Sequence, residues 1–171
     1  MTTTMNPFAT YRAALLRALL VTVIVLIPVA LADAQSAPPK PAAPRTGAQI
    51  FSSTCVACHQ AQGEGTDKYP PLAESEWVNG DESRVVRIIL HGLTGDVEVQ
   101  GQLYSGAMPA WGPTLSDSEI AAVATYIRSS WGNKAFPIAA ATVTQARTAY
   151  AGRTAPWTVP ELLLIKAGEK K

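Results

Sequence analysis

Two cysteines and a histidine stand together in the segment Cys55-Val56-Ala57-Cys58-His59. Two thiols separated by two residues and followed by a histidine are the pattern that attaches a c-type haem. Each thiol can bond one vinyl-derived carbon of the same porphyrin, and the histidine can give an axial nitrogen to the iron. The spacing therefore predicts one covalently attached haem c, with Cys55 and Cys58 as its anchors and His59 as an iron ligand.

A redox-active dithiol and a zinc site are the alternatives for the same motif. A catalytic Cys-x-x-Cys usually follows a strand of a βαβ unit, whereas residues 47–54 have a helical pattern. A zinc site needs three or four protein ligands, and adjacent Cys58 and His59 cannot easily close on one ion. The chain has two cysteines in total, so it has no further thiol for a disulfide or a four-thiolate site. These points favour the haem.

Met108 is the strongest candidate for a second axial ligand. Met1 and Met5 lie in the N-terminal segment, and Met108 is the third and last methionine. It stands in Gly106-Ala107-Met108-Pro109, where the proline stiffens the chain. Methionine most often fills gaps in a core, but a loop between glycine and proline is a poor place for that role. His/Met ligation would raise the reduction potential.

His91 is the other histidine of the chain and competes with Met108 as a ligand. It follows a helical pattern over residues 82–90 and precedes Gly92. The helix dipole favours a histidine in the last turn without any metal. We therefore expect His91 to be a helix-end or surface residue.

Three helical segments are expected to position these residues: 47–56, 82–90 and 116–131. The first leads into the cysteine motif, and the second has apolar residues at i, i+3 and i+4. The third begins at a capping box formed by Ser116 and Glu119. We expect the first and last helices to pack together, with glycine at the start of the first allowing close backbone approach.

The segments between the helices are expected to be loops. Glycines and prolines interrupt residues 60–72, and residues 94–111 lack a helical period. The expected fold class is all-α, with three to four helices and long loops around one haem. The porphyrin would supply the centre of a core that loops alone would leave poorly filled.

The N-terminal segment has the pattern of an export signal. Arg12 and Arg17 precede an apolar run over residues 18–32, which ends in Ala30-Leu31-Ala32. The run is shorter than the roughly 20 residues of a stable spanning helix. We expect residues 1–32 to be a cleaved signal peptide, with an uncleaved membrane anchor as the alternative. Either outcome places the rest of the chain in the periplasm or on the periplasmic face of the inner membrane.

Three further regions follow this segment. Residues 33–45 are rich in alanine and proline and are expected to form a stiff, extended linker. Residues 46–133 are the expected haem domain. Residues 134–171 form a basic C-terminal extension, in which residues 142–151 are weakly helical.

The net charge of +1 is unevenly distributed. Residues 46–131 carry four basic and ten acidic side chains, for a net charge of −6. Residues 132–171 carry six basic and two acidic side chains, for a net charge of +4. An acidic domain argues against nucleic acid as a partner and favours a redox partner with a basic patch, although solvated faces also carry such charges. The basic extension could itself dock to a partner.

Taken together, these motifs resemble the class I c-type cytochromes. The resemblance covers about residues 46–133 and rests on the cysteine motif, Tyr69-Pro70-Pro71-Leu72, Gly106-Ala107-Met108-Pro109 and the helix Leu115–Trp131. It implies the small cytochrome c fold, thioethers at Cys55 and Cys58, His59 as proximal ligand and Met108 as distal ligand.

Two further details follow from the resemblance. A carbonyl from Pro70 or Pro71 is expected to accept the proximal imidazole N–H, and Gln60 stands where many relatives have glycine. The strings Met108-Pro109-Ala110-Trp111 and Ser130-Trp131-Gly132-Asn133 are similar to bacterial periplasmic monohaem domains. Those domains serve alcohol, aldehyde or sugar dehydrogenases and terminal oxidases.

The expected function is one-electron transfer, because two axial ligands leave no open position on the iron for a substrate. The chain would carry electrons in a periplasmic respiratory chain between a dehydrogenase and an oxidase or reductase, without an enzymatic activity of its own. It could act alone or as the cytochrome subunit of an oxidoreductase complex. The alternatives are a catalytic or gas-sensing haem protein with a displaceable distal ligand, and a colourless non-haem module.

Overall fold

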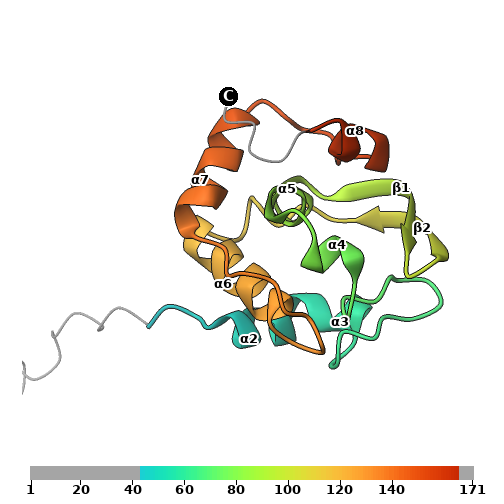
Figure 1. Ribbon diagram of the computed structural model, residues 1–171. Helices are drawn as coiled ribbons and strands as arrows, with labels where there is room; N and C mark the ends of the chain where they lie inside the picture. The colour runs from blue at the N-terminus through green and yellow to red at the C-terminus, as the bar shows by residue number, and fades with distance from the viewer. Residues whose placement is uncertain (1–42, 166–171) are drawn as a thin grey trace, which may run out of the picture. The chain divides into compact units, whose positions relative to one another are not determined.

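The computed structural model describes residues 43–165 (Figure 1). The expected signal peptide at 1–32, most of the linker at 33–45 and residues 166–171 lie outside the described residues. The described part of the linker contains neither helix nor strand. Between residues 43 and 165, the helices are all too short or too polar to cross a membrane.

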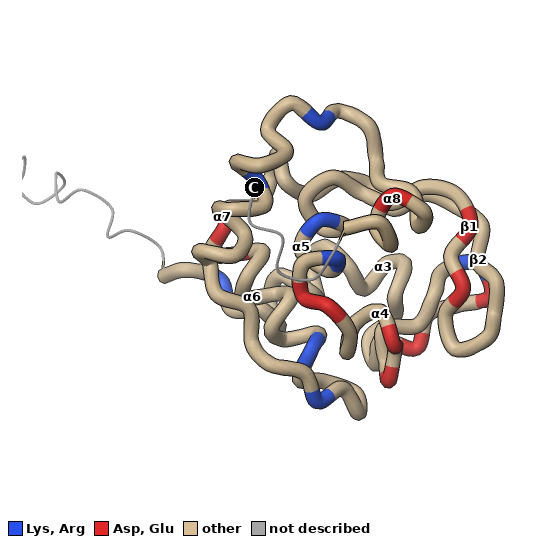
Figure 2. Tube along the Cα trace, turned by 45° about the horizontal axis from the view of Figure 1, so that its top comes forward, with Lys and Arg blue, Asp and Glu red and all other residues tan. Residues whose placement is uncertain are grey.

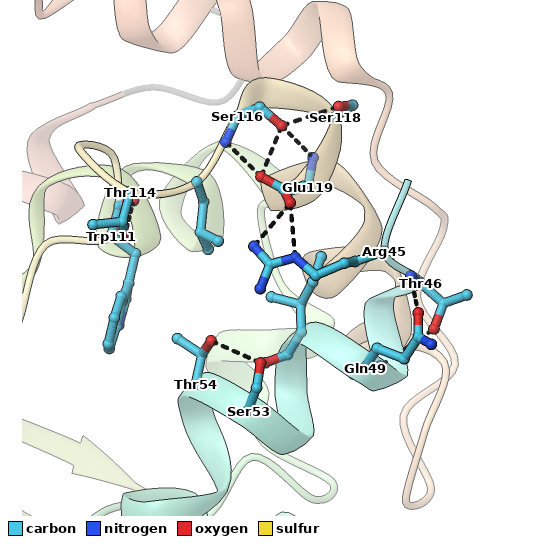
Figure 3. Close-up of polar contacts among 12 residues, drawn as sticks. Arg45, Thr46, Gln49, Ser53, Thr54, Trp111, Thr114, Ser116, Ser118 and Glu119 are labelled. Atoms are coloured by element: carbon cyan, nitrogen blue, oxygen red, sulfur yellow. Dashed lines mark hydrogen bonds and ion pairs between the residues drawn. The ribbon is translucent and has the colours of Figure 1, made fainter. Parts of the chain in front are cut away.

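The cysteine motif ends a continuous helical segment, as predicted. α2 (Gly47–Ile50) begins at Thr46, which exchanges capping hydrogen bonds with Gln49 (Figure 3). The segment continues as the π-helical turn η1 (Phe51–Cys55) and as α3 (Val56–His59). Helical structure therefore extends beyond the predicted end, and the whole motif is helical.

Two helices follow the loop after the motif. α4 (Glu76–Asn79) is a short helix in a stretch with no predicted element. α5 (Glu82–His91) begins at Asp81, whose carboxylate accepts a hydrogen bond from the Ser83 amide at 2.9 Å. His91 is its last residue, at the helix end where the sequence predicts it.

The prediction of a loop over residues 94–111 is wrong, because most of this segment is a β-hairpin. β1 (Leu93–Val99) pairs antiparallel with β2 (Gln102–Met108). The turn residues Gln100 and Gly101 have φ angles of 53° and 74°, as a two-residue hairpin turn with positive φ at both positions requires. The expected all-α class is corrected to a helical fold with a small two-stranded sheet.

α6 (Asp117–Arg128) begins at the predicted capping box and ends before the predicted Trp131. The Ser116 hydroxyl accepts from the Glu119 amide at 3.3 Å, and the Glu119 carboxylate accepts from the Ser116 amide at 3.0 Å (Figure 3). Arg45 forms an ion pair with the same carboxylate at 2.8 Å. α2 packs against α6, as expected for the first and last helices of the domain.

The described part of the C-terminal extension, residues 134–165, folds onto the preceding helices and the hairpin. α7 (Ala140–Ala149) packs on α5 and α6, and α8 (Val159–Leu164) packs against β1 (Figure 1). Ile138 and Val143 join the same hydrophobic core as residues of the other helices. The weakly helical pattern at 142–151 therefore corresponds to a helix that is part of the core.

Candidate haem site

An apolar cavity lies between the motif helix, the loop after it and the hairpin. It contains about 1350 Å³ of space free of protein atoms, part of which is open to solvent. Cys55, Cys58, His59 and Met108 all line it. The structure thus brings together the four residues that the sequence predicts for the site, while His91 is not among the lining residues.

One wall of the cavity is a face of the β-hairpin. Residues paired directly across a hairpin point to the same face, and three such pairs line the cavity: Leu93 with Met108, Gly95 with Gly106, and Val97 with Tyr104. The two glycines leave the middle of this wall without a side chain. A Cβ at either position would meet no atom within 4 Å, so a flat ring has room to lie against the backbone there.

Aliphatic side chains of two helices form much of the remaining lining. They are Val85, Ile88 and Ile89 of α5, and Val123 and Ile127 of α6. Such a lining excludes water and stabilises a large apolar ring by burial. The flat glycine wall, the apolar lining and the two thiols together fit a covalently bound porphyrin.

The His59 ring is oriented by the loop after the motif. Its Nδ1 lies 3.0 Å from the carbonyl oxygen of Pro70. Because a carbonyl can only accept, Nδ1 carries the proton and Nε2 keeps a free lone pair. Burial lowers the pKa of His59, and the bond to Pro70 opposes this effect. His59 is thus a neutral imidazole with Nε2 available to iron, and Pro70 rather than Pro71 is its partner.

Backbone hydrogen bonds hold the loop that carries Pro70. The Gly65 amide donates to the His59 carbonyl at 3.0 Å, and the Thr66 amide donates to the Tyr69 carbonyl at 2.8 Å. Gly65 has a φ of +68°, and a Cβ there would lie 2.4 Å from the Tyr69 carbonyl oxygen. A residue without a side chain is therefore required where the loop folds back beside His59.

The two cysteines are partly buried and are not joined to each other by a disulfide. Burial, followed by the proximity of Cys58, raises the pKa of Cys55 to about 11. A redox-active Cys-x-x-Cys depends on a lowered thiol pKa, so this environment disfavours the dithiol alternative. Within residues 43–165, His, Cys, Asp and Glu side chains do not gather in groups of three or more that could hold a metal ion.

Met108 is the last residue of β2 and is half-buried against the core. It therefore lies at a strand end rather than in the expected loop. After Pro109 the chain is fastened to α5, because the Trp111 amide donates to the Ile89 carbonyl at 2.9 Å and the Gly112 amide to the Leu90 carbonyl at 3.1 Å. Both sides of Met108 are thus held by backbone hydrogen bonds.

His91 lies in the contact with the C-terminal extension. Its ring meets the rings of Tyr150 and Trp157 edge-on, with centroid distances of 6.5 and 6.3 Å. Burial is the main cause of its lowered pKa, followed by the positive charge of Arg153. His91 thus packs where α5 meets the extension, a role that the sequence did not reveal.

Several site residues were not singled out from the sequence. Gly95 and Val97 alternate with Asp96 and Glu98, a period of two that is typical of a strand with one buried face. Trp77 of α4 also lines the cavity, and its Nε1 donates to the Glu98 carbonyl at 2.9 Å. No local pattern predicts that contact, because it joins elements far apart in the chain.

Comparisons with known proteins agree with this geometry. The family described as "Cytochrome C oxidase, cbb3-type, subunit III" matches residues 42–127, half of the chain. Cytochrome c-552 of Thermus thermophilus is 38% identical over 92 residues, which cover 51% of this chain and 69% of that protein.

Two subunits of larger complexes are also similar. The gluconate 2-dehydrogenase cytochrome c subunit of Pantoea cypripedii is 37% identical over 98 residues, 53% of this chain and 21% of that protein. The cbb3-type cytochrome c oxidase subunit FixP of Azorhizobium caulinodans is 31% identical over 102 residues, 58% of this chain and 31% of that protein. The chain thus spans a fifth to a third of these two relatives. Together with the cavity and its motif, the matches show that the chain belongs to the cbb3-type subunit III family of c-type cytochromes, which are monohaem electron-transfer domains with a covalent haem c.

Proposed function

We propose that Cys55 and Cys58 form the two thioether bonds and that His59 Nε2 and Met108 Sδ are the axial ligands. One observation carries this proposal: the four residues line one apolar cavity, and Pro70 turns the His59 ring so that Nε2 is the free nitrogen. When bound, the haem iron supplies one-electron oxidation and reduction.

The residues of the chain hold the group and keep its surroundings fixed. The Pro70 carbonyl fixes the His59 tautomer, which strengthens the imidazole as a ligand. The hairpin and the backbone bonds to α5 keep Met108 in place, where its sulfur would hold the iron. The aliphatic lining excludes water from the ring. His59 and Met108 would together hold the iron, so the haem would supply electron transfer and the domain would turn over no substrate itself.

The acidic surface supports a partner with a basic patch. Asp96 and Glu98 of β1 and Glu76 of α4 are exposed, and acidic positions mark the hairpin and α4 in Figure 2. Opposite charges speed the encounter of transient redox partners. We infer that the chain passes electrons between a periplasmic dehydrogenase and an oxidase or reductase, and relatives named as subunits of both kinds of complex support this role.

The proposed location is the periplasm or the periplasmic face of the inner membrane. The pattern of residues 1–32 supports export, as a cleaved signal peptide or as an anchor. Covalent haem attachment outside the cytoplasm requires the same export. Mass spectrometry of the purified protein distinguishes the two forms by the N-terminal residue.

A visible spectrum and a redox titration of the purified protein test the ligand set. We expect haem that stays with the denatured polypeptide, low-spin spectra in both oxidation states and a potential above that of bis-histidine haem. Met108→Ala should retain the covalent haem but bind carbon monoxide rapidly and lose the high potential. A colourless protein, or a wild type that binds carbon monoxide as fast as Met108→Ala, would overturn the assignment and favour the alternatives.

A further inference from the structure

The C-terminal extension contacts two neighbours of Met108: the start of β1, which pairs with Met108, and the loop that follows Met108. One contact passes through Trp157, which precedes α8, and the other through Arg147 of α7. We propose that Trp157 and Arg147 are positioning residues for Met108, so that the extension determines how firmly the distal ligand is held. This inference rests on the proposed ligation by Met108.

Trp157 extends the hairpin by one parallel bridge, to Leu93. Its amide donates to the Gly92 carbonyl at 3.0 Å, and its carbonyl accepts from the Thr94 amide at 2.8 Å. These bonds occupy one edge of β1 at the position where the other edge pairs with Met108. Leu93 is thus held between Trp157 and Met108.

Gly92 brings the bridge still closer to the ligand. It has a φ of +80°, and a Cβ there would lie 2.4 Å from the carbonyl oxygen of Met108. The residue that accepts the Trp157 amide therefore lies directly against the Met108 backbone. A shift of Trp157 would therefore displace both the start of β1 at Leu93 and the end of β2 at Met108.

Trp157 is itself firmly fixed. It is 4% exposed, its ring meets that of Tyr150 at 5.0 Å, and the guanidinium of Arg153 lies 3.6 Å from its ring centroid. Arg153 also bonds the Pro156 carbonyl and the Glu161 carboxylate, at 2.7 and 2.9 Å. Aromatic packing and a cation–π contact each add to the stability of such a cluster.

Arg147 holds the chain on the other side of Met108. Nη1 donates to the Gly112 carbonyl at 2.7 Å and Nη2 to the Leu115 carbonyl at 3.0 Å. Nε donates to the Asp117 carboxylate at 2.7 Å. One planar guanidinium thus fixes the loop between Met108 and α6, which lysine could not do with the same geometry.

The sulfur of Met108 would hold the iron only while its strand stays in place. Local opening of the hairpin end would separate the sulfur from the cavity, and the free energy of that opening depends on the contacts it breaks. The backbone bridge of Trp157 to Leu93 and the hydrogen bonds of the Arg147 guanidinium are contacts of this kind. Weakening either should expose the distal position more often, without changing the cysteines or His59.

The test measures the rate at which imidazole binds to the oxidised, haem-loaded protein. Trp157→Ala and Arg147→Gln should each raise this rate by about 2- to 30-fold, the range in which residues that couple two sites act. Both should also lower the reduction potential. Trp157→Phe keeps an aromatic ring and should restore most of the wild-type rate.

Two matched controls separate positioning from general loss of packing or charge. Phe136→Ala removes an aromatic side chain of the same extension that is 85% exposed. Arg45→Gln removes the ion pair between Arg45 and Glu119, which lies in the first turn of α6 as Asp117 does. Arg45 bonds the Glu119 carboxylate but, unlike Arg147, no carbonyl of residues 112–115. Both controls should bind imidazole at the wild-type rate.

Met108→Ala distinguishes failure of this inference from failure of the ligand assignment. If Met108→Ala binds imidazole no faster than wild type, the proposed ligation is wrong and the positioning role falls with it. If Met108→Ala binds imidazole faster than wild type but Trp157→Ala and Arg147→Gln bind it at the wild-type rate, the positioning role alone is overturned.

Hydrogen exchange of the wild-type holoprotein provides a second measurement should the variants not mature. The amides of Thr94 and Trp157 should exchange together with the amide of Met108, which faces Leu93 across the hairpin, as one opening unit. Exchange of the Trp157 amide while the Met108 amide stays protected would contradict the inference.

Discussion

Gly47 lies against Ala122 so closely that a Cβ at position 47 would be 2.2 Å from the Ala122 carbonyl oxygen. It would also lie 2.7 Å from the Cβ of Tyr126. α2 and α6 thus cross with their backbones in contact. Since α2 leads into the cysteine motif and α6 lines the cavity, this crossing fixes one end of the haem site.

Gly47→Ala should lower the free energy of unfolding by about 1–3 kcal/mol, the usual cost of overpacking. The loss should appear although alanine has the higher helix propensity. Chemical denaturation of the haem-loaded protein measures it. Gly152→Ala is the control, because a Cβ at that position meets nothing within 4 Å. Equal stability of the two variants would contradict the close crossing.

Gln60→Gly should stabilise the protein. Gln60 ends α3 with φ 61° and ψ 168°, a region that is essentially restricted to glycine and costs about 1–3 kcal/mol for other residues. Glycine relieves this strain but adds entropy to the unfolded chain, so we expect a net gain of about 1 kcal/mol. Thermal or denaturant unfolding measures the gain.

Gln62→Gly is the matched control for Gln60→Gly. Gln62 is exposed in the same loop and is not among the residues with positive φ. Glycine there should lower stability by about 0.4–1 kcal/mol, since it only increases unfolded-state freedom. A destabilised Gln60→Gly variant would show that the side chain makes contacts that outweigh the strain.

Gly106→Val should reduce the amount of haem-loaded protein severalfold. The new side chain would stand in the middle of the glycine wall, where the flat ring is proposed to lie, while valine suits a strand. Haem absorbance per polypeptide, measured after expression with a maturation system, tests this outcome. Ser105→Val, on the opposite face of the same strand, should load normally. Equal loading of both variants would mean that the ring does not approach this wall.

Local patterns in the sequence predicted the parts of the fold that depend on neighbouring residues. Cys55, Cys58 and His59 form a motif, and Ser116 and Glu119 form a capping box, so both could be identified by spacing alone. Met108 was found by elimination among few candidates. The structure places it in the cavity, although at a strand end.

The hairpin was missed because its glycines resemble those of a loop. Gly95 and Gly106 interrupt the two strands, and the turn begins with Gln100 rather than the asparagine or aspartate that usually marks such turns. Alternation of Val97 and Val99 with acidic residues was the available signal. The contacts of Trp157 and Arg147 could not be predicted, since they depend on how distant segments pack.

Acidic pH should weaken the contact between α5 and the extension through His91. Burial comes first among the causes that lower its pKa; the charges of Arg153 and Arg147 add to it, and a hydrogen bond to the Arg153 backbone opposes it. The unfolded chain therefore takes up a proton before the folded protein does. Stability should fall as pH drops below the ordinary histidine pKa of about 6.5 and level off below the folded-state pKa, with a slope of at most about 1.4 kcal/mol per pH unit. Denaturant unfolding of the holoprotein between pH 8 and pH 5 measures this, and His91→Gln should make the decline shallower, while the part that comes from the lowered pKa of His59 remains. The carboxylates of Asp117, Glu119 and Glu161 have lowered pKa values, so their contributions are lost only in more acidic solution. An unchanged decline in His91→Gln would assign it to another group.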